Sequence, residues 1–239
     1  MVEYNRNIRG GISVTDYRQF RLSKLNTPEF SHLKYLLFWP AYGLVFMLLE
    51  RFVTLDYTYM HCALDDVIPF CEYFIVPYLF WFVYLVGMLA YTLFFDTKSF
   101  VYMMKLIIIT CSAAIAAYVI FPSAQELRPM VFERSNIFTE IVRGFYKFDT
   151  NTNVCPSVHV SAAVVVMMTA WTSKHFNTVP YRIAFAAVTV LICLSTVFLK
   201  QHSVIDVVWG IVVCAAAEVI IRVWDAYREH ICAQMRQKI

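Results

Sequence analysis

The chain has 239 residues, of which 60% are hydrophobic and only 15% are charged, and its formal net charge is +3. This composition differs strongly from that of soluble globular proteins and indicates a membrane protein with a single domain. The small net charge and the lack of a basic stripe argue against a nucleic-acid partner. The first 30 residues are polar and basic without an apolar core, so we expect no cleaved signal peptide.

Six apolar runs follow one another along the chain. A helix needs about 20 apolar residues to cross roughly 30 Å of hydrocarbon. The sequence therefore predicts an all-α membrane bundle with six transmembrane helices, in which residues 35–223 form the membrane domain between a basic arm (1–34) and a tail (224–239). The last two runs are separated by three residues, which predicts a tight turn. The predicted spans are Tyr35–Phe52, Glu72–Phe95, Phe100–Phe121, Ser157–Thr172, Arg182–Leu199 and Ser203–Val223.

Charge asymmetry predicts the orientation. The first loop, Val53–Cys71, contains three aspartates and no Lys or Arg, whereas the arm and the tail are basic. The positive-inside rule then places both termini in the cytoplasm. The loop 122–156 carries four basic residues and weakens the contrast, but the even number of spans agrees. We expect a multi-pass protein, with a bacterial cell membrane as its location. The basic residues of the N-terminal arm and the C-terminal tail that enter this argument are Arg6, Arg9, Arg18, Arg21, Lys24, Lys34, Arg222, Arg228, Arg236 and Lys238.

Two further segments are predicted to lie at the membrane surface. Val53–Phe70 has too many carboxylates for a span and is interpreted as an amphipathic or re-entrant stretch over the outer face. From Ile137 to Phe145 apolar residues recur at helical spacing, with Gly144 as a stop signal, which predicts an interfacial helix. The seven cysteines show no metal-ligand spacing, so no metal is expected. Cys62 and Cys71 would pair only if their loop faces an oxidising compartment.

The start of the fourth predicted span suits an anion. Pro156 is typical of the first turn of a helix, so the amides that follow it would lack helical partners. Unpaired amides and the helix dipole together bind phosphate groups. Ser157 adds a hydroxyl group and His159 an imidazole, although Ser157 alone is more often a helix cap. The sixth span also begins at the outer face, so its N-terminus is expected to face the same anion.

A second histidine lies at the start of the sixth span. His202 and Asp206 are four residues apart and therefore stack on one helix face. Asp206 is placed to accept the Nδ1–H of His202, which leaves Nε2 free to attack an electrophile. An aspartate in an apolar run needs a partner, but the pair taken alone would equally suit a turn cap. The other histidines considered are interpreted as solvated loop residues: His32, His61, His175 and His230.

In order and spacing, these motifs resemble those of the type 2 phosphatidic acid phosphatase superfamily, which includes lipid phosphate phosphatases and membrane phosphotransferases. The pattern of that superfamily is K-x6-R-P, P-S-G-H and S-R-x5-H-x3-D. Each piece is weak alone, but the ordered set is specific and covers residues from about 121 to 206. The matching residues are Arg128-Pro129, Pro156-Ser157-Val158-His159, and Ser195-Thr196 with His202 and Asp206.

Two cations of the superfamily pattern are absent. Phe121 stands where the pattern has its lysine, and Thr196 where it has an arginine. Lys200 lies one turn beyond Thr196 and is a candidate for restoring a positive charge. The stretch from Ser195 to His202 looks closer to the inositol-phosphotransferase branch, which includes inositol-phosphorylceramide synthases. That branch also lacks the full set of cations.

The resemblance implies a role for each matching residue. His202 would attack phosphorus and form a phosphohistidine, Asp206 would hold its ring, and His159 would act as acid and base, without metal or other cofactor. The implied function is hydrolysis of a lipid phosphate monoester or pyrophosphate at the extracytoplasmic face of the bilayer. Transfer of a phospho-head group, such as phosphoinositol, to a lipid alcohol remains an alternative, as does a catalytically silent scaffold or a transporter. The implied phosphate-binding residues are Arg128, Ser157 and Lys200.

Overall fold

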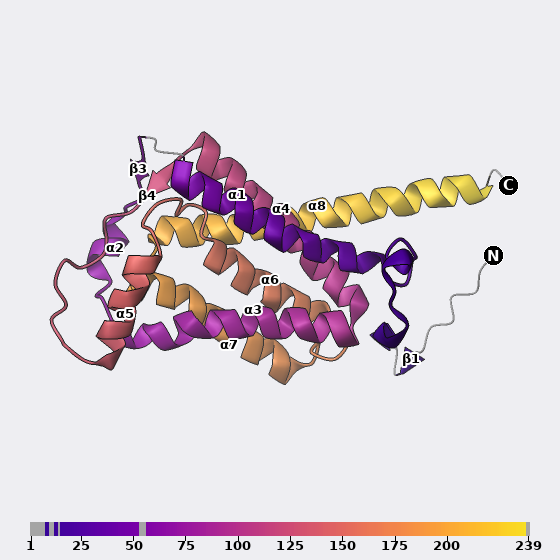
Figure 1. Ribbon diagram of the computed structural model, residues 1–239, viewed down its shortest axis with the longest axis horizontal. Helices are drawn as coiled ribbons and strands as arrows, with labels where there is room; N and C mark the ends of the chain where they lie inside the picture. The colour runs from indigo at the N-terminus through magenta and orange to yellow at the C-terminus, as the bar shows by residue number, and fades with distance from the viewer. Residues whose placement is uncertain (1–7, 10–11, 14, 53–55, 238–239) are drawn as a thin grey trace.

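The computed structural model describes residues 8–9, 12–13, 15–52 and 56–237. Within these ranges most of the chain is helical, and its long helices run side by side (Figure 1). The all-α class predicted from the sequence is confirmed in this sense. Arg6 and Lys238, which entered the orientation argument, lie outside the described residues, as does the start of the first loop, 53–55.

Short strands and 3-10 turns connect the helices. Two antiparallel strands, Ile8–Arg9 (β1) and Ile12–Ser13 (β2), precede 3-10 turns at Tyr17–Gln19, Leu22–Lys24 and Ser31–Leu37 (η1 to η3). Thr58–Tyr59 (β3) pairs in parallel with Ser123–Ala124 (β4), and Glu72–Phe74 forms another 3-10 turn (η4). The α-helices are Phe38–Phe52 (α1), Ala63–Val67 (α2), Ile75–Phe95 (α3), Thr97–Ile120 (α4), Ile137–Phe148 (α5), Val158–Thr172 (α6), Val179–Phe198 (α7) and Val204–Gln237 (α8).

Five helical segments of the described chain are long and apolar enough to cross a membrane. Four of them correspond to α3, α4, α7 and α8, and the fifth runs from η3 into α1 as Ser31–Arg51. The remaining predicted span is α6, a shorter apolar helix of 15 residues. At 1.5 Å per residue α6 is about 22 Å long, less than the hydrocarbon thickness of about 30 Å. The count of six full spans therefore stays a prediction.

Helix α6 occupies the middle of the bundle, in contact with α3, α4, α7 and α8. Its small apolar residues Ala163, Val165 and Val166 are fully buried. A helix that is apolar on all sides is stable only where other helices surround it. The central position of α6 explains both its composition and its tolerance of a short length, because protein rather than lipid covers it.

Two helix ends differ from the sequence prediction. We predicted that the last span ends at Val223, but α8 continues to Gln237. Residues 224–237 contain no Gly or Pro and include good helix formers such as Ala, Arg, Glu and Gln, so nothing in the sequence stops the helix. Gly144 likewise does not end the helix that we predicted in the loop 122–156, since α5 continues to Phe148; Asn136 caps the start of this helix. The predicted helix in this loop is otherwise confirmed.

The interpretation of His32 as a solvated residue was wrong. His32 is buried, and its Nε2 lies 2.8 Å from the hydroxyl oxygen of Tyr17. The reason is that the polar arm folds back onto the bundle, where Tyr17 also donates a hydrogen bond to the carbonyl oxygen of Leu93. His61, in contrast, is exposed as predicted and contacts Asp66 at 2.8 Å.

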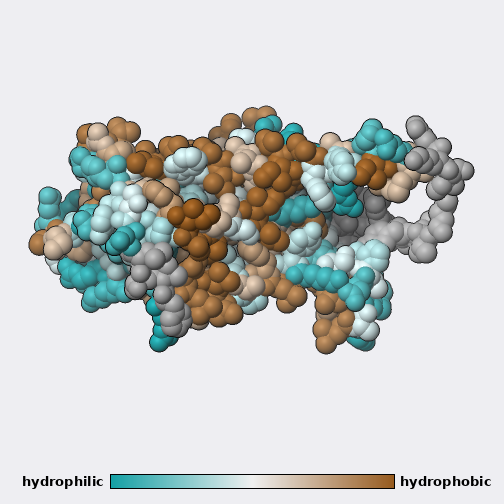
Figure 2. Space-filling view, turned by 90° about the horizontal axis from the view of Figure 1, so that it is seen from above, coloured by the Kyte–Doolittle hydropathy of each residue, from teal (hydrophilic) through white to brown (hydrophobic). Residues whose placement is uncertain are grey.

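The two ends of the bundle differ in what they carry. Elements α2, α5, β3 and β4 gather at the end where α6 and α8 begin, and we call this the His202 end (Figure 1). The β1–β2 hairpin and the extension of α8 lie at the opposite end. Apolar residues cover the middle of the face seen in Figure 2, with hydrophilic residues toward the ends. Cys62 and Cys71, at the His202 end, are both free thiols.

Candidate active site

The predicted tight turn between the last two helices is present and carries His202. Helix α7 ends at Phe198, and Lys200 adopts a left-handed backbone with φ of 52°. The amides of Gln201 and His202 both donate to the carbonyl oxygen of Thr196, at 2.9 and 3.1 Å. Such bonds close a helix C-terminus and reverse the chain. The turn thereby places His202 directly before the first residues of α8.

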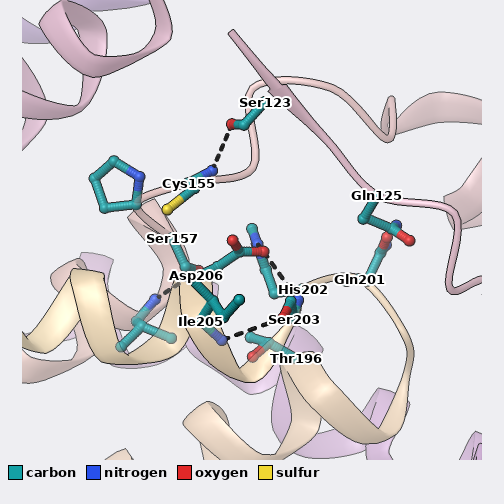
Figure 3. A network of polar contacts seen from close by, with 12 residues as sticks. Ser123, Gln125, Cys155, Ser157, Thr196, Gln201, His202, Ser203, Ile205 and Asp206 are labelled. Carbon is teal, nitrogen blue, oxygen red and sulfur yellow. Dashed lines mark hydrogen bonds and ion pairs between the residues drawn. The ribbon is translucent and has the colours of Figure 1, made fainter. Parts of the chain in front are cut away.

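His202 and Asp206 lie together, as their spacing predicts. Nδ1 of His202 is 3.4 Å from Oδ2 of Asp206, and both side chains are buried. That oxygen accepts a hydrogen bond of 2.9 Å from the amide of Ser203, while Nδ1 of His202 and Oδ1 of Asp206 have no hydrogen-bond partner (Figure 3). Catalytic hydrogen bonds are often long before substrate binds. The pair is close enough to tighten around a substrate.

The start of α6 is tied to the start of α8. Ser157 is the N-cap of α6, and its hydroxyl oxygen accepts a hydrogen bond of 3.4 Å from the amide of Val160. Its own amide donates to the backbone carbonyl of Asp206 at 3.1 Å, so this amide is not available to an anion as we expected. Pro156 precedes the cap instead of forming the first helical turn. Gly210 allows the approach, since a Cβ there would lie 3.0 Å from the carbonyl oxygen of Ser157.

His159 is held by aromatic residues of α3. Its ring stacks on Tyr78 with centroids 4.8 Å apart, and Trp81 lies against it at 4.5 Å. The indole N–H of Trp81 also donates to the carbonyl oxygen of His159 at 2.9 Å. The rings of His159 and His202 are 6.0 Å apart between centroids. The structure thus brings the two predicted histidines to one place.

Arg128 joins α5 to the turn that carries His202. Its guanidinium donates to three carbonyl oxygens, those of Tyr146, Asp149 and Thr150, and to Oε1 of Gln201 at 2.5 Å. Burial lowers the pKa of Arg128, and the nearby negative charge of Asp149 opposes this effect. Protein oxygens thus hold the two terminal nitrogens of Arg128, whereas its buried Nε has no hydrogen-bond partner among the described residues.

The ammonium group of Lys200 and the N-terminus of α8 are both bound by the segment that contains Asp65. The ammonium group of Lys200 donates to the carbonyl oxygens of Asp65 and Ile68, both at 2.6 Å. The first amide of α8, at Val204, donates to the carboxylate of Asp65 at 2.9 Å. The expectation that this helix N-terminus faces the same anion as α6 was therefore wrong, because a side chain of the protein already occupies it.

The two positions that depart from the motif differ in their surroundings. Phe121 is 51% exposed and follows the end of α4. Thr196 is fully buried, and its hydroxyl donates to the carbonyl oxygen of Cys193 at 2.8 Å. Neither Phe121 nor Thr196 supplies a positive charge. Of the two cations predicted to bind phosphate, Arg128 contacts the side chain of Gln201 next to His202, whereas Lys200 points its ammonium group to Asp65 and Ile68.

Sequence reasoning missed several polar residues around the site. Gln125 is fully buried, its Oε1 accepts from the amide of Leu127 at 2.6 Å, and its Nε2 has no hydrogen-bond partner. In Figure 3 its side chain points toward that of Gln201. Burial raises the pKa of Asp149, and the positive charge of Arg128 opposes this effect. Isolated residues of this kind leave no pattern in one sequence. Among the described residues no group of three or more His, Cys, Asp or Glu side chains forms a metal-binding cluster.

Comparison with known proteins gives the family. No curated protein and no solved structure matches this chain. The family model described as the PAP2 superfamily matches residues 102–230, which is more than half of the chain and includes Arg128, Ser157, His159, His202 and Asp206. The chain is therefore a member of the PAP2 superfamily, the type 2 phosphatidic acid phosphatases and their relatives.

Proposed function

We propose that the protein is an integral-membrane lipid phosphatase that hydrolyses a lipid phosphate monoester or pyrophosphate at the outer membrane face. The observation that carries the proposal is the approach of His159 and His202 to 6.0 Å between ring centroids, at the starts of two apolar helices. A phosphoryl group beside both rings would meet a nucleophile and a proton donor at once. Membership of a superfamily of phosphoric-ester hydrolases and related transferases supports this chemistry.

In the first half-reaction, Nε2 of His202 attacks phosphorus and forms a P–N bond. The P–O bond to the lipid breaks, and protonated His159 gives its proton to the departing oxygen, so the lipid alcohol leaves. Asp206, 3.4 Å from Nδ1, holds the imidazole and stabilises the positive charge that develops on it.

In the second half-reaction, neutral His159 takes a proton from water as the water oxygen bonds to phosphorus. The P–N bond then breaks, its electron pair returns to Nε2 of His202, and inorganic phosphate is released. Arg128 would stabilise the phosphoryl oxygens by exchanging its contact with Gln201 for one of them. Ser157, at the start of α6, would contribute its hydroxyl group. The guanidinium of Arg128 and the hydroxyl of Ser157 would both stabilise the negative charge on the phosphoryl oxygens in the transition state.

One observation favours a second candidate, transfer of a phospho-head group to a lipid alcohol. The site has neutral residues at both positions where the superfamily pattern has a cation, Phe121 and Thr196, and the ammonium of Lys200 is bound to two carbonyl oxygens. A phosphodiester carries one negative charge, whereas a phosphate monoester carries up to two. A site in which Arg128 is the one cation of the described residues free to meet the phosphate therefore matches the single charge of a phosphodiester, whereas the three cations of the superfamily pattern match the higher charge of a phosphate monoester.

The test is to incubate the purified full-length protein with a panel of lipid phosphates, lipid pyrophosphates and phosphodiester donors, with and without inositol or glycerol. Free phosphate and new lipid products are followed together. Release of phosphate identifies a phosphatase, and a new phosphodiester lipid identifies a transferase. If neither product forms with any donor, the enzymatic proposal fails.

The matched variants are His202→Ala and His61→Ala. We expect His202→Ala to lower turnover by about a thousandfold or more, because the nucleophile is lost. His61 lies at the same end of the bundle, is exposed and contacts Asp66, so His61→Ala is expected to retain activity. Retention of phosphate release or transfer by His202→Ala contradicts the phosphohistidine mechanism. In cells, an unchanged phenotype after loss of His159, His202 and Asp206 together would instead indicate a scaffold.

A further inference from the structure

The first loop of the chain is docked onto the turn that carries His202. Helix α2 and the residues around it belong to this loop, more than 130 positions away in sequence from the contacts that they make. The amide of Cys71 donates to the carbonyl oxygen of Phe198 at 3.0 Å, at the end of α7. This segment precedes residue 102, where the match to the PAP2 superfamily begins. The docking is thus contributed by a part of this chain outside that match.

Asp65 is the centre of the docking contact. Its side chain is 2% exposed, and its Oδ2 accepts hydrogen bonds from the hydroxyl of Ser203 at 2.6 Å and from the amide of Cys62 at 2.8 Å. Its Oδ1 accepts from the amide of Val204 at 2.9 Å. A carboxylate at a helix N-terminus is stabilised by the unpaired amides and by the helix dipole. Asp65 therefore acts as an internal anion for α8.

Lys200 forms the second anchor of the same contact. Its ammonium group donates to the carbonyl oxygen of Asp65 and to that of Ile68, both at 2.6 Å. Lys200 lies two residues before His202, and Ser203 lies directly after it. The nucleophile candidate thus stands between two residues that are both fixed to the α2 segment. Lys200 is also the residue of the turn that adopts the left-handed backbone conformation.

We propose that Asp65 is a positioning residue for His202, acting through Ser203, Val204 and Lys200 and not by contact with the substrate. The proposal rests on the proposed role of His202 as nucleophile. Binding energy of the loop is used to fix the imidazole before substrate arrives, because a nucleophile displaced by about 1 Å costs roughly a hundredfold in rate. Groups of the protein already engage both carboxylate oxygens of Asp65 and the ammonium of Lys200, so these side chains hold the turn instead of the substrate.

The test compares Asp65→Asn with Asp66→Asn in the full-length protein. The amide of Asn keeps the size of the side chain but has one acceptor oxygen where Asp65 has two. We expect kcat to fall by about tenfold to a hundredfold with KM within about twofold of wild type. Asp66, the next residue of α2, is exposed and contacts His61, so Asp66→Asn is expected to leave both constants unchanged.

Ser203→Ala and Lys200→Met are the milder variants, and they serve if Asp65→Asn does not fold. Each is expected to lower kcat with little effect on KM, and Asp65→Asn combined with Ser203→Ala is expected to cost less than the product of the separate losses. A wild-type kcat in Asp65→Asn, or in both milder variants, overturns the proposal. So does a rise in KM alone, which would indicate substrate binding. If His202→Ala is as active as wild type, it is the proposed function that fails.

Discussion

The two histidines of the site are supported in different ways. His202 stands on a turn fixed by hydrogen bonds and charge, with Asp65, Ser203 and Asp206 around it. His159 is held by the faces of aromatic rings of α3 and by one hydrogen bond from Trp81 to its carbonyl oxygen. The proposed nucleophile benefits from a fixed direction, which the polar contacts of its turn provide. The proposed acid and base must change charge in each cycle, and stacking orients the ring of His159 through its faces and not through its nitrogens.

The largest effect that tests this contrast is expected from His159→Ala. General acid catalysis contributes about 10²–10⁴ in rate, so hydrolysis of a lipid phosphate with an alkoxide leaving group is expected to slow by that factor. An aryl phosphate has a better leaving group and needs less protonation, so release of its aryl alcohol in the first half-reaction is expected to slow far less.

The two substrates are compared by the rate at which the leaving group is released in a single turnover, because the second half-reaction, in which His159 is the proposed base, is the same for both substrates. His175→Ala is the control, because His175 is exposed and lies in the α6–α7 connection at the opposite end. An equal loss with both substrates would show that His159 does not act as the proton donor to the leaving group.

A smaller effect is expected at Gly210 of α8, where this helix contacts the start of α6, the helix that carries His159. A Cβ at this position would lie 3.0 Å from the carbonyl oxygen of Ser157 and 3.1 Å from Cγ1 of Val160, so α6 and α8 must move apart. Overpacking of this kind costs about 1–3 kcal/mol, which exceeds the gain of about 1 kcal/mol from replacing Gly by Ala in a helix. We expect Gly210→Ala to lower the unfolding temperature and to reduce kcat by about tenfold.

The matched control is Gly87→Ala in α3, where nothing lies within 4 Å of the added Cβ. This variant is expected to be neutral or slightly more stable, because only the helix propensity changes. Thermal unfolding in detergent and turnover are measured for both variants. If Gly210→Ala behaves like Gly87→Ala, the close approach of α6 and α8 does not determine the distance between the histidines.

Local patterns in the sequence were sufficient to predict the helices and the contact between His202 and Asp206, but not the residues that hold this pair in place. Apolar runs predicted the helices of the bundle, and the spacing of four predicted that His202 and Asp206 meet. The contact of Asp65 with Ser203 joins residues 138 positions apart and has no local signal. The first loop contains no Lys or Arg, which indicates that a buried Asp65 must be paired with residues outside this loop, but it does not indicate which ones. Tyr78 and Trp81 lie one helical turn apart, and this spacing predicts only that they share a face of the helix, not that they pack on His159.

The smallest predicted effect compares two carboxylates at the His202 end. Burial raises the pKa of both Asp65 and Asp149, but in Asp65 the hydrogen bonds from Ser203, Val204 and Cys62 outweigh burial, so its pKa lies below the usual value. In Asp149 burial outweighs the nearby positive charge of Arg128, so the pKa of Asp149 is raised. A lowered pKa in the folded state stabilises the fold above the pKa of the unfolded chain, whereas a raised one loses stability as pH increases through it.

The two Asn variants are therefore expected to differ in sign at neutral pH. Asp149→Asn removes a carboxylate that is costly when ionised, so it should unfold at a temperature higher than wild type at pH 7, by a few degrees at most. Its advantage should disappear as pH falls below the ordinary pKa of aspartate, about 3.9, because wild-type Asp149 is then protonated. Asp65→Asn should unfold at a lower temperature than wild type at pH 7, with the deficit shrinking only at more acidic pH, as the folded-state carboxylate of Asp65 protonates. Unfolding temperatures measured from pH 7 downward decide the matter, since parallel curves for the two variants would mean that polar contacts do not distinguish these carboxylates.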